Sequence, residues 1–175
     1  MNSNLFKSIL SAVLLTIAWP INGFSMLIFV AFVPLLQVLY DQPSKKSKQT
    51  TAFFFTGFFL WNLGISWWIW NASPFGMWFA VIVNSWLMTI VFMATRMVIR
   101  RLSHQAGLLF LTTFWMSFEL LHLYWDFSWP WFQLGNVFSE TTSWIQWYEY
   151  TGVFGGSLWV WIVNILCFQA VRGTS

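Results

Sequence analysis

The chain alternates long uncharged, hydrophobic runs with short stretches that carry its charges. Residues 8–40 contain no charged side chain, and neither do residues 49–95. A helix needs about 20 residues to cross a hydrocarbon core about 30 Å thick, because each residue adds about 1.5 Å. Each run is therefore long enough for two spans. The turn-forming residues at 19–23 and 71–76, which include proline, glycine and asparagine, mark where each run divides.

The pattern predicts an all-α membrane protein with six transmembrane helices and an aromatic-rich segment on the outer face between the fifth and sixth. The predicted spans cover residues 5–21, 24–40, 51–71, 76–99, 107–124 and 152–171. Pro34 lies inside the second span and is expected to kink it, because proline removes a helical hydrogen bond. No internal repeat or long linker divides the chain, so residues 1–175 are expected to form a single membrane module.

The composition supports this class and excludes others. Hydrophobic residues make up 58% of the chain, aromatic residues 22% and charged residues only 7%, whereas soluble domains carry about 25% charge. A water-soluble enzyme, a nucleic-acid-binding protein and a disordered tail are therefore excluded together. The single cysteine, Cys167, excludes a disulfide framework. No cluster of cysteine and histidine has metal-binding spacing, so neither a metal nor a cofactor is expected.

The basic residues indicate the orientation in the membrane. In the six-span arrangement all eight fall on one side, which the positive-inside rule assigns to the cytoplasm. Both termini are therefore expected in the cytoplasm. The basic residues are Lys7, Lys45, Lys46, Lys48, Arg96, Arg100, Arg101 and Arg172.

Residues 126–150 differ from the rest of the chain, because tryptophan and tyrosine are mixed there with acidic residues. Tryptophan and tyrosine prefer the level of the lipid headgroups, where one end of the ring is apolar and the other is hydrated. We expect this segment to lie on, or dip into, the outer membrane face. The alternative is an ordinary surface loop.

The fifth predicted span carries the most informative polar residues. Trp115, Glu119, His122 and Asp126 are spaced by four, three and four residues, which places them on one helix face. An ionisable group inside a bilayer costs about 3 kcal/mol or more, so these side chains should face protein or water. Two interpretations stay open: a polar pocket that opens outward, and a hydrogen-bonded pair of Glu119 and His122 that fixes helix packing.

Other polar residues in the spans have simpler interpretations. Residues 155–157, Gly-Gly-Ser, are compatible with a serine nucleophile, but small residues in membrane helices are more typical of close packing. Asn62, Asn84 and Asn164 are expected to form hydrogen bonds between helices.

The order and spacing of these features resemble the bacterial apolipoprotein N-acyltransferases along the whole chain. Most specific is the exit of the fifth span, where Glu119 is followed by a Pro-Trp pair, Pro130-Trp131, and then by Gly135. His122 stands where the family carries arginine. Similar stretches occur at residues 18–24, 30–36, 57–69, 152–157 and 163–164.

The resemblance implies a reaction that moves an acyl chain from a phospholipid to the amino group of a lipoprotein's diacylglyceryl-cysteine, through a thioester on the enzyme. In the family, a Glu-Lys-Cys triad in a periplasmic nitrilase-like domain performs this chemistry. That domain is absent from these 175 residues, every lysine is on the cytoplasmic side and Cys167 lies in the last span. We therefore expect no catalytic residue in this chain, which would be inactive without that domain, supplied in cis or in trans.

The same resemblance implies a bacterial inner-membrane location and a lipid entrance at the outer side. The residues expected to border this entrance are Glu119, His122, Trp129, Trp131 and Glu149. The expected partners are phospholipid and lipoprotein substrates, and nucleic acid is not among them. The alternative is a stand-alone six-helix membrane protein with a binding or scaffolding role. A small transporter is disfavoured, because Glu119 is the only acidic residue in the middle of a span.

Overall fold

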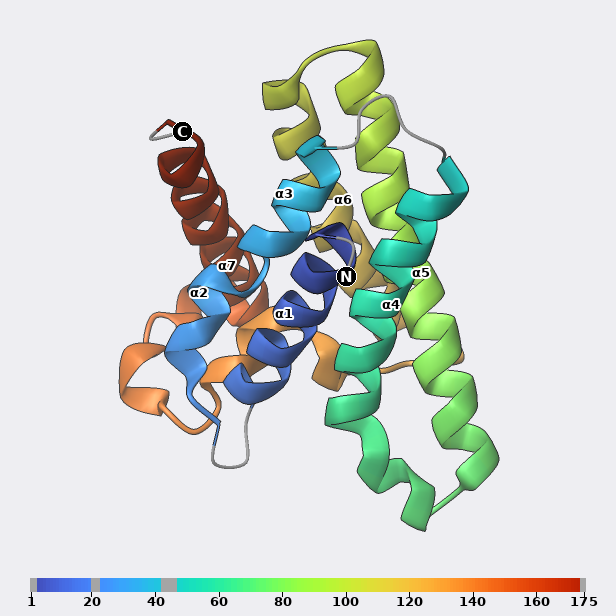
Figure 1. Cartoon of the computed structure of the whole chain (residues 1–175). Coiled ribbons are helices and arrows are strands. Elements are labelled where there is room, and N and C mark those ends of the chain that lie inside the picture. Colours follow the sequence, from blue (N-terminus) through green and yellow to red (C-terminus); the bar gives the residue numbers. More distant parts are fainter. Residues whose placement is uncertain (1–2, 20–22, 42–46, 174–175) are drawn as a thin grey trace.

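The computed structural model describes residues 3–19, 23–41 and 47–173, and all regular structure in these residues is helical (Figure 1). The predicted all-α fold is therefore confirmed. The longer helices are α1 (Ser3–Ala18), α2 (Ile28–Ala31), α3 (Val33–Asp41), α4 (Ser47–Ser66), α5 (Pro74–Arg101), α6 (His104–Tyr124) and α7 (Tyr148–Gly173). Short 3-10 helices are η1 (Ser25–Leu27), η2 (Trp67–Asn71), η3 (Pro130–Phe132), η4 (Leu134–Phe138) and η5 (Thr142–Trp144).

Four of these helical segments are long and apolar enough to cross a membrane, which makes the chain a membrane protein. They are Ser47–Asn71, Pro74–Arg101, His104–Tyr124 and Tyr148–Gly173. Two shorter apolar helical segments, Ser3–Ala18 and Ser25–Asp41, coincide with the first two predicted spans. The observed segments match the six predicted ranges within about five residues at either end.

The predicted helix boundaries have local causes. The side chain of Ser73 accepts a hydrogen bond from the amide of Gly76 at 3.0 Å, and Pro74 occupies the first turn of α5. Ser103 caps α6 in the same way by accepting from Ala106 at 3.1 Å. Serine before the first turn satisfies a backbone donor that the helix cannot, and proline suits the first helical position. The other division was predicted at residues 19–23, and residues 20–22 of it lie outside the described residues.

The second predicted span, which the structure shows as Ser25–Asp41, is interrupted near Pro34 as expected, and it divides there into α2 and α3. The break falls at Phe32, between α2 and α3, two residues before Pro34. Proline lacks the backbone N–H group and its ring collides with the preceding turn, so an unbroken helix is disfavoured here. The side chain of Asn164 in α7 accepts from the Phe32 amide at 2.9 Å and donates to the Ile28 carbonyl at 2.8 Å. It therefore replaces the helical bond that these two groups would otherwise form.

Aromatic rings fill the centre of the bundle. Phe32 lies 4.6 Å from Trp161 between ring centroids, and Trp161 lies 5.1 Å from Trp115. Phe92 and Trp61 complete this cluster, and all five side chains are fully buried. Because each aromatic side chain buries a large apolar area, this cluster joins helices from both ends of the sequence into one core.

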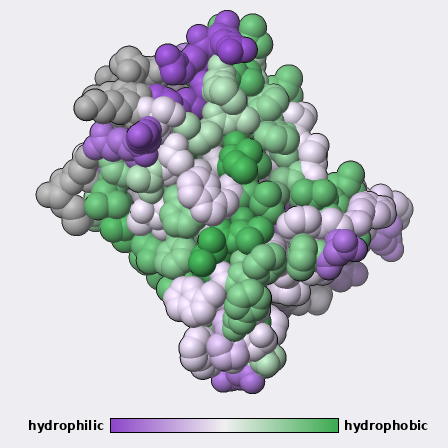
Figure 2. Space-filling model, turned by 90° about the vertical axis from the view of Figure 1, so that its right-hand side faces the viewer, coloured by the Kyte–Doolittle hydropathy of each residue, from purple (hydrophilic) through white to green (hydrophobic). Residues whose placement is uncertain are grey.

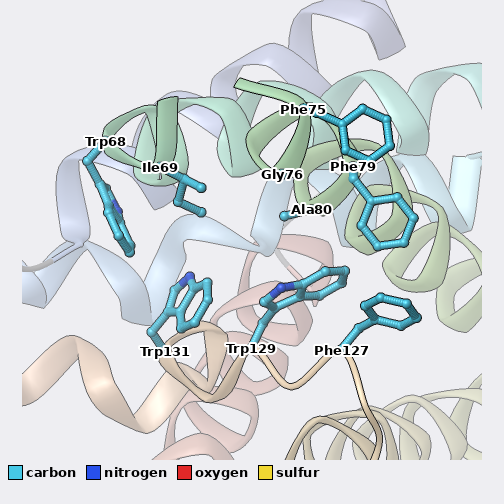
Figure 3. Close-up of a pocket in the computed structure, with 9 residues that line it drawn as sticks. All are labelled: Trp68, Ile69, Phe75, Gly76, Phe79, Ala80, Phe127, Trp129 and Trp131. Carbon is cyan, nitrogen blue, oxygen red and sulfur yellow. The ribbon is translucent and has the colours of Figure 1, made fainter. Parts of the chain in front are cut away.

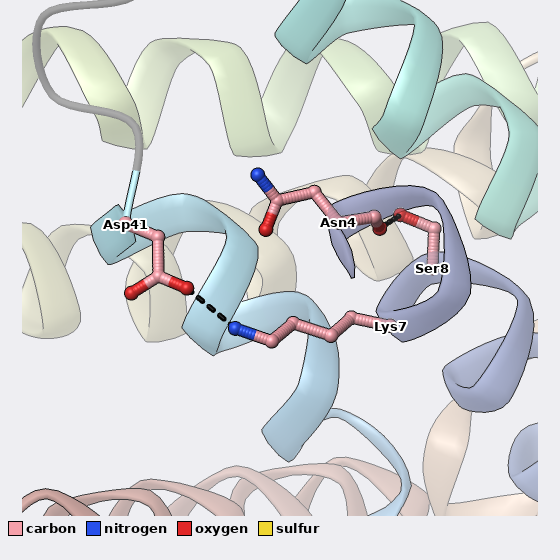
Figure 4. Close-up of polar contacts among 4 residues, drawn as sticks. All are labelled: Asn4, Lys7, Ser8 and Asp41. Carbon is pink, nitrogen blue, oxygen red and sulfur yellow. Dashed lines mark hydrogen bonds and ion pairs between the residues drawn. The ribbon is translucent and has the colours of Figure 1, made fainter. Parts of the chain in front are cut away.

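One ion pair ties the start of α1 to the end of α3 (Figure 4). Lys7 Nζ lies 2.5 Å from Asp41 Oδ2. Within α1, the Ser8 hydroxyl donates a hydrogen bond to the Asn4 carbonyl at 3.0 Å. The ion pair is partly exposed, so its contribution to stability is about 0–1 kcal/mol. Its more specific effect is to neutralise Asp41, which lies at the same end of the molecule as Lys48, Arg101 and Arg172.

The surface carries the pattern expected of a membrane protein. Figure 2 shows hydrophobic side chains across the middle of one face, with hydrophilic side chains gathered at its upper end and in smaller groups at its right-hand and lower edges. Large apolar side chains are exposed on the outer faces of the helices, among them Leu109 and Leu166. Contact of such side chains with lipid tails costs no free energy, whereas their exposure to water would be unfavourable.

Candidate functional site at the tryptophan-rich end

The polar face of α6 is buried, although it is shorter than the sequence pattern predicts. Trp115, Glu119 and His122 lie on one face and are at most 1% exposed. The helix ends at Tyr124, and Trp125 turns into an extended conformation. Asp126 therefore lies beyond the helix and is exposed, so its predicted place on this face is wrong.

Glu119 anchors the segment that follows α6. Its Oε1 accepts hydrogen bonds from Trp115 Nε1 at 3.0 Å and from the backbone amide of Leu134 at 2.9 Å. The next amide, of Gly135, donates to the hydroxyl of Ser157 at 3.0 Å. Two consecutive backbone donors are thus held by side chains of α6 and α7. Since unpartnered buried donors are costly, this arrangement fixes η4 against both helices.

Close packing explains the small residues at the start of α7. The Tyr148 hydroxyl donates to the Gly135 carbonyl at 2.9 Å. A Cβ atom on Gly156 would lie only 1.6 Å from that hydroxyl oxygen and 2.9 Å from the Gly135 Cα. Ser157 is fully buried, and its hydroxyl oxygen accepts a hydrogen bond from the Gly135 amide. The packing interpretation of residues 155–157 is therefore confirmed.

His122 belongs to a different hydrogen-bond network from Glu119. Its Nδ1 accepts from Trp125 Nε1 at 3.2 Å, and its Nε2 lies 3.1 Å from Asn84 Oδ1. Asn84 Nδ2 donates to Asn62 Oδ1 at 2.7 Å. An indole N–H can only donate, so Nδ1 must accept and Nε2 must carry the hydrogen. The interpretation of Glu119 and His122 as a bonded pair is wrong, whereas the predicted hydrogen bonding of Asn62 and Asn84 between helices is confirmed.

An apolar cavity of about 490 Å³ lies at the end of the molecule where α6 leaves the bundle. Figure 3 shows side chains of η2 and α5 facing those of residues 127–131 across it. Its size lies within the range of about 300–1,000 Å³ that is typical of ligand pockets. Its walls offer hydrocarbon and aromatic surface and no charge. The lining residues are Trp68, Ile69, Phe75, Gly76, Phe79, Ala80, Phe127, Trp129 and Trp131.

A second, larger cavity of about 850 Å³ has two lining residues, Trp68 and Trp131, in common with the first. These two rings meet edge to face, with centroids 5.9 Å apart. The second cavity also presents polar groups, from Thr16, Asn136 and Ser139. The tryptophan pair therefore stands where an apolar compartment adjoins a mixed one, an arrangement suited to an amphipathic molecule.

The structure places the five predicted site residues in three environments. Trp129 and Trp131 line the apolar cavity. Glu119 and His122 are buried behind it and support the surrounding segment through the bonds described above. Glu149 is exposed in the first turn of α7. Within the described residues, no group of three or more histidine, cysteine or acidic side chains could hold a metal ion.

η2 and the start of α5 also contribute to this site, which was not predicted from the sequence. Trp68, Ile69 and Phe79 form one wall, although they lie 52–63 residues before Trp131. A signal was present, because the tryptophans at 67–70 end one predicted span at the same end of the molecule as Trp129 and Trp131. Aromatic residues at the ends of different spans are brought together when those ends share one membrane face.

Comparison with known proteins adds independent information. The sequence profile described as "Apolipoprotein N-acyltransferase N-terminal domain" matches residues 11–166. An apolipoprotein N-acyltransferase of Chlorobaculum tepidum is 28% identical over 167 residues, which is 92% of this chain and 30% of that protein. One from Geobacter metallireducens is 29% identical over 175 residues, covering 95% of this chain and 33% of that protein. This chain spans about a third of the length of these relatives. No solved structure matches.

Proposed function

Since this chain belongs to the family of apolipoprotein N-acyltransferase N-terminal domains, we propose that it is the membrane module of such an enzyme. The proposed reaction transfers a fatty acyl chain from a phospholipid to the N-terminal diacylglyceryl-cysteine of lipoproteins. The observation that carries this proposal is the family match over residues 11–166, which includes every residue that lines the apolar cavity.

The proposed topology has six crossings, with both termini of this chain in the cytoplasm of a bacterium and the chain in its inner membrane. The start of α6 and the C-terminus lie at one end of Figure 1, and the turn between η2 and α5 lies at the other. Basic residues gather at the first end, at Lys48, Arg101 and Arg172. This distribution supports a cytoplasmic assignment of that end. Reporter fusions after residues 72 and 103 test it: the first must report the outside and the second the cytoplasm.

The apolar cavity is the proposed entrance for the acyl chain. Its tryptophans lie at the end assigned to the outer interface, where phospholipid and lipoprotein substrates are both anchored. Glu119 holds the backbone three residues after Trp131, and His122 packs against Trp129 with ring centroids 5.5 Å apart. These two buried residues are proposed to position the walls of the entrance. Glu149, which is exposed in the first turn of α7, is proposed to lie at the headgroup level.

In this proposal the chain orients substrates and does not perform the chemistry. When the protein holds an acyl chain in a fixed place, binding energy offsets part of the entropic cost of the reaction. The cysteine nucleophile and its basic and acidic partners belong to a catalytic domain, which acts in cis or in trans. The native product size distinguishes these cases. An antibody against residues 42–49 detects a product well above 20.6 kDa in the first case and near 20.6 kDa in the second.

The experiment that tests the entrance compares two tryptophan variants in the complete enzyme. Trp131 lines both cavities, whereas Trp144 lies in the same aromatic segment and lines neither. We expect Trp131→Ala to lower the rate of lipoprotein N-acylation about tenfold, the equivalent of about 1.4 kcal/mol in the transition state. Trp144→Ala should stay within about twofold of the wild type. Mass spectrometry of lipoprotein N-termini gives the rate, and immunoblots correct for abundance. Equal rates for both variants would contradict the proposal.

A further inference from the structure

The side chain of Trp131 carries a hydrogen-bond donor that has no acceptor in the described part of the chain. Its indole Nε1 is buried there and makes no hydrogen bond. We propose that this N–H group binds the ester carbonyl of a diacylglycerol lipid whose acyl chain occupies the apolar cavity. That the cavity admits acyl chains rests on the proposed function, whereas the hydrogen bond is a binding property and needs no acyl transfer.

Other indole N–H groups at this end of the molecule have acceptors. That of Trp115 donates to the Glu119 carboxylate at 3.0 Å. That of Trp68, on the opposite wall of the cavity, donates to the Ile65 carbonyl at 3.0 Å. A buried indole N–H group usually has a partner, and a missing one costs free energy. The donor of Trp131 therefore indicates an acceptor that is supplied from outside the chain.

The position of Trp131 distinguishes its donor from two others. The indole N–H groups of Trp61 and Trp161 are also buried without a partner among the described residues. Both rings are fully buried in the central aromatic cluster and line neither of the two cavities. In Figure 3 the nitrogen of Trp131 lies on the edge of the ring that faces Ile69 across the apolar cavity. Of these three donors, only that of Trp131 borders a space for a ligand.

The two ends of the cavity suit the two ends of an acyl ester. At one end, Trp68 and Trp131 also line the second cavity, which presents polar groups. At the other end, Phe79 and Phe127 pack with ring centroids 5.0 Å apart and offer only hydrocarbon. Figure 3 shows Trp131 and Phe127 at opposite ends of one wall, with Trp129 between them. An acyl chain that runs from Trp131 to Phe127 would place its ester group beside the indole N–H group.

The lack of charge around this donor favours a neutral acceptor. None of the residues that line the apolar cavity is acidic or basic. A phosphate or a carboxylate would lose its hydration there without a cation to pair with, which is costly. An ester carbonyl is an uncharged acceptor that is joined to a hydrocarbon chain. It therefore fits both the N–H donor and the apolar walls.

A neighbouring ring must shift before a ligand reaches Nε1 of Trp131, because this atom is buried. The Trp68 ring lies edge to face with Trp131, with centroids 5.9 Å apart, and is 46% exposed. Trp129, on the same wall as Trp131, is only 8% exposed. The half-exposed Trp68 is therefore the ring that has room to move. Its replacement should alter how easily a lipid enters, but not the chemical link that the protein recognises.

The test compares lipids that differ only in how their chains are linked. Dipalmitoyl phosphatidylcholine has ester links, and dihexadecyl phosphatidylcholine has ether links. Native mass spectrometry measures how much of each lipid the complete protein retains in detergent. The wild type should retain the ester lipid about fivefold better, as one hydrogen bond implies. Trp131→Phe keeps an aromatic ring but removes the N–H group, so the preference should fall below about twofold. Trp68→Phe changes a residue whose N–H group is bonded within the protein, and should preserve the preference.

A second pair of ligands distinguishes the source of the ester group. A peptide that begins with dipalmitoylglyceryl-cysteine carries the same esters as a phospholipid, and its dihexadecyl counterpart carries ethers. The pair that shows the larger preference, removed by Trp131→Phe, identifies the lipid that the cavity holds.

The outcomes separate this hydrogen bond from the proposed function. A ratio of two lipids on one sample depends neither on how much of a variant folds nor on acylation. The hydrogen bond is overturned if the wild type prefers the ester in neither pair, or if Trp131→Phe keeps the preference in both. Loss of the preference in Trp68→Phe as well would also overturn it. Normal acylation by Trp131→Ala would instead contradict the proposed entrance.

Discussion

Asn164 and Phe32 are 132 residues apart in the sequence, and the side chain of the first completes the backbone hydrogen bonding of the second at 2.9 Å. The same carboxamide donates to the Ile28 carbonyl at 2.8 Å and to the Val160 carbonyl at 2.9 Å. Ser11 on α1 donates its hydroxyl to the carbonyl of Ala31. A broken helix inside a membrane requires such partners, because no water reaches the freed groups.

Replacing Asn164 by leucine should therefore destabilise the bundle. Asn164→Leu introduces an apolar side chain of similar size and leaves the Phe32 amide and the Ile28 carbonyl without their side-chain partner. We expect a loss of about 1–3 kcal/mol in the free energy of unfolding. Thermal unfolding in detergent measures it. Thr113→Val, which removes an exposed hydroxyl bonded only within its own helix, is the control and should change little.

Two glycines of α7 provide a matched test of close packing. Gly156→Ala places a methyl group 1.6 Å from the Tyr148 hydroxyl, so the ring must move and lose its bond to Gly135. We expect this variant to lose about 1–3 kcal/mol of stability. Gly173→Ala meets no atom within 4 Å and should be as stable as the wild type. If both variants unfold at the same temperature, the close contact at Gly156 is not present.

The role of Glu119 as an acceptor predicts different outcomes for two substitutions. Glu119→Gln retains an oxygen for the Leu134 amide and for Trp115, so residues 130–138 should stay in place. Glu119→Leu removes both bonds and should cost about 1–3 kcal/mol. Limited proteolysis reports this difference, because a released η4 is cut faster. Faster cleavage in Glu119→Gln than in Glu119→Leu would show that charge, and not acceptance of these bonds, is what matters.

The bond between Asn84 and His122 predicts a measurable coupling between α5 and α6. In a double-mutant cycle of Asn84→Ala and His122→Ala, the coupling energy should be about 0.6 kcal/mol, the average for such bonds in a membrane protein, and at most about 1.7 kcal/mol. The control cycle pairs Asn84→Ala with Thr113→Val on the exposed face of α6 and should be additive. Unfolding in detergent gives both values. Additivity in the first cycle would mean that the bond contributes nothing.

The helices could be predicted from the sequence because hydrophobic length and capping residues are local properties. The divisions at Ser73 and Ser103, for example, depend on side chains within three residues of the helix start. The break at Phe32 was predicted only as a kink at Pro34, because its geometry depends on Asn164. A residue type predicts that a hydrogen bond is needed, but the sequence does not show which distant backbone group provides it.

The candidate site divides in the same way. The predicted tryptophans, Trp129 and Trp131, line the cavity, because an aromatic residue at a membrane interface keeps that preference in any arrangement. One of the two interpretations left open, the pairing of Glu119 with His122, was wrong, since spacing on one helix does not determine rotamers. Their partners come from η4 and α5, namely the Leu134 backbone and Asn84.

This chain is proposed to be part of the machinery that N-acylates lipoproteins. Depletion of the protein in its source cells, followed by mass spectrometry of lipoprotein N-termini, tests this proposal. Diacylglyceryl-cysteine with a free amino group should accumulate, and the wild type and Trp144→Ala should restore acylation far better than Trp131→Ala. Fully N-acylated lipoproteins in depleted cells would overturn the proposal.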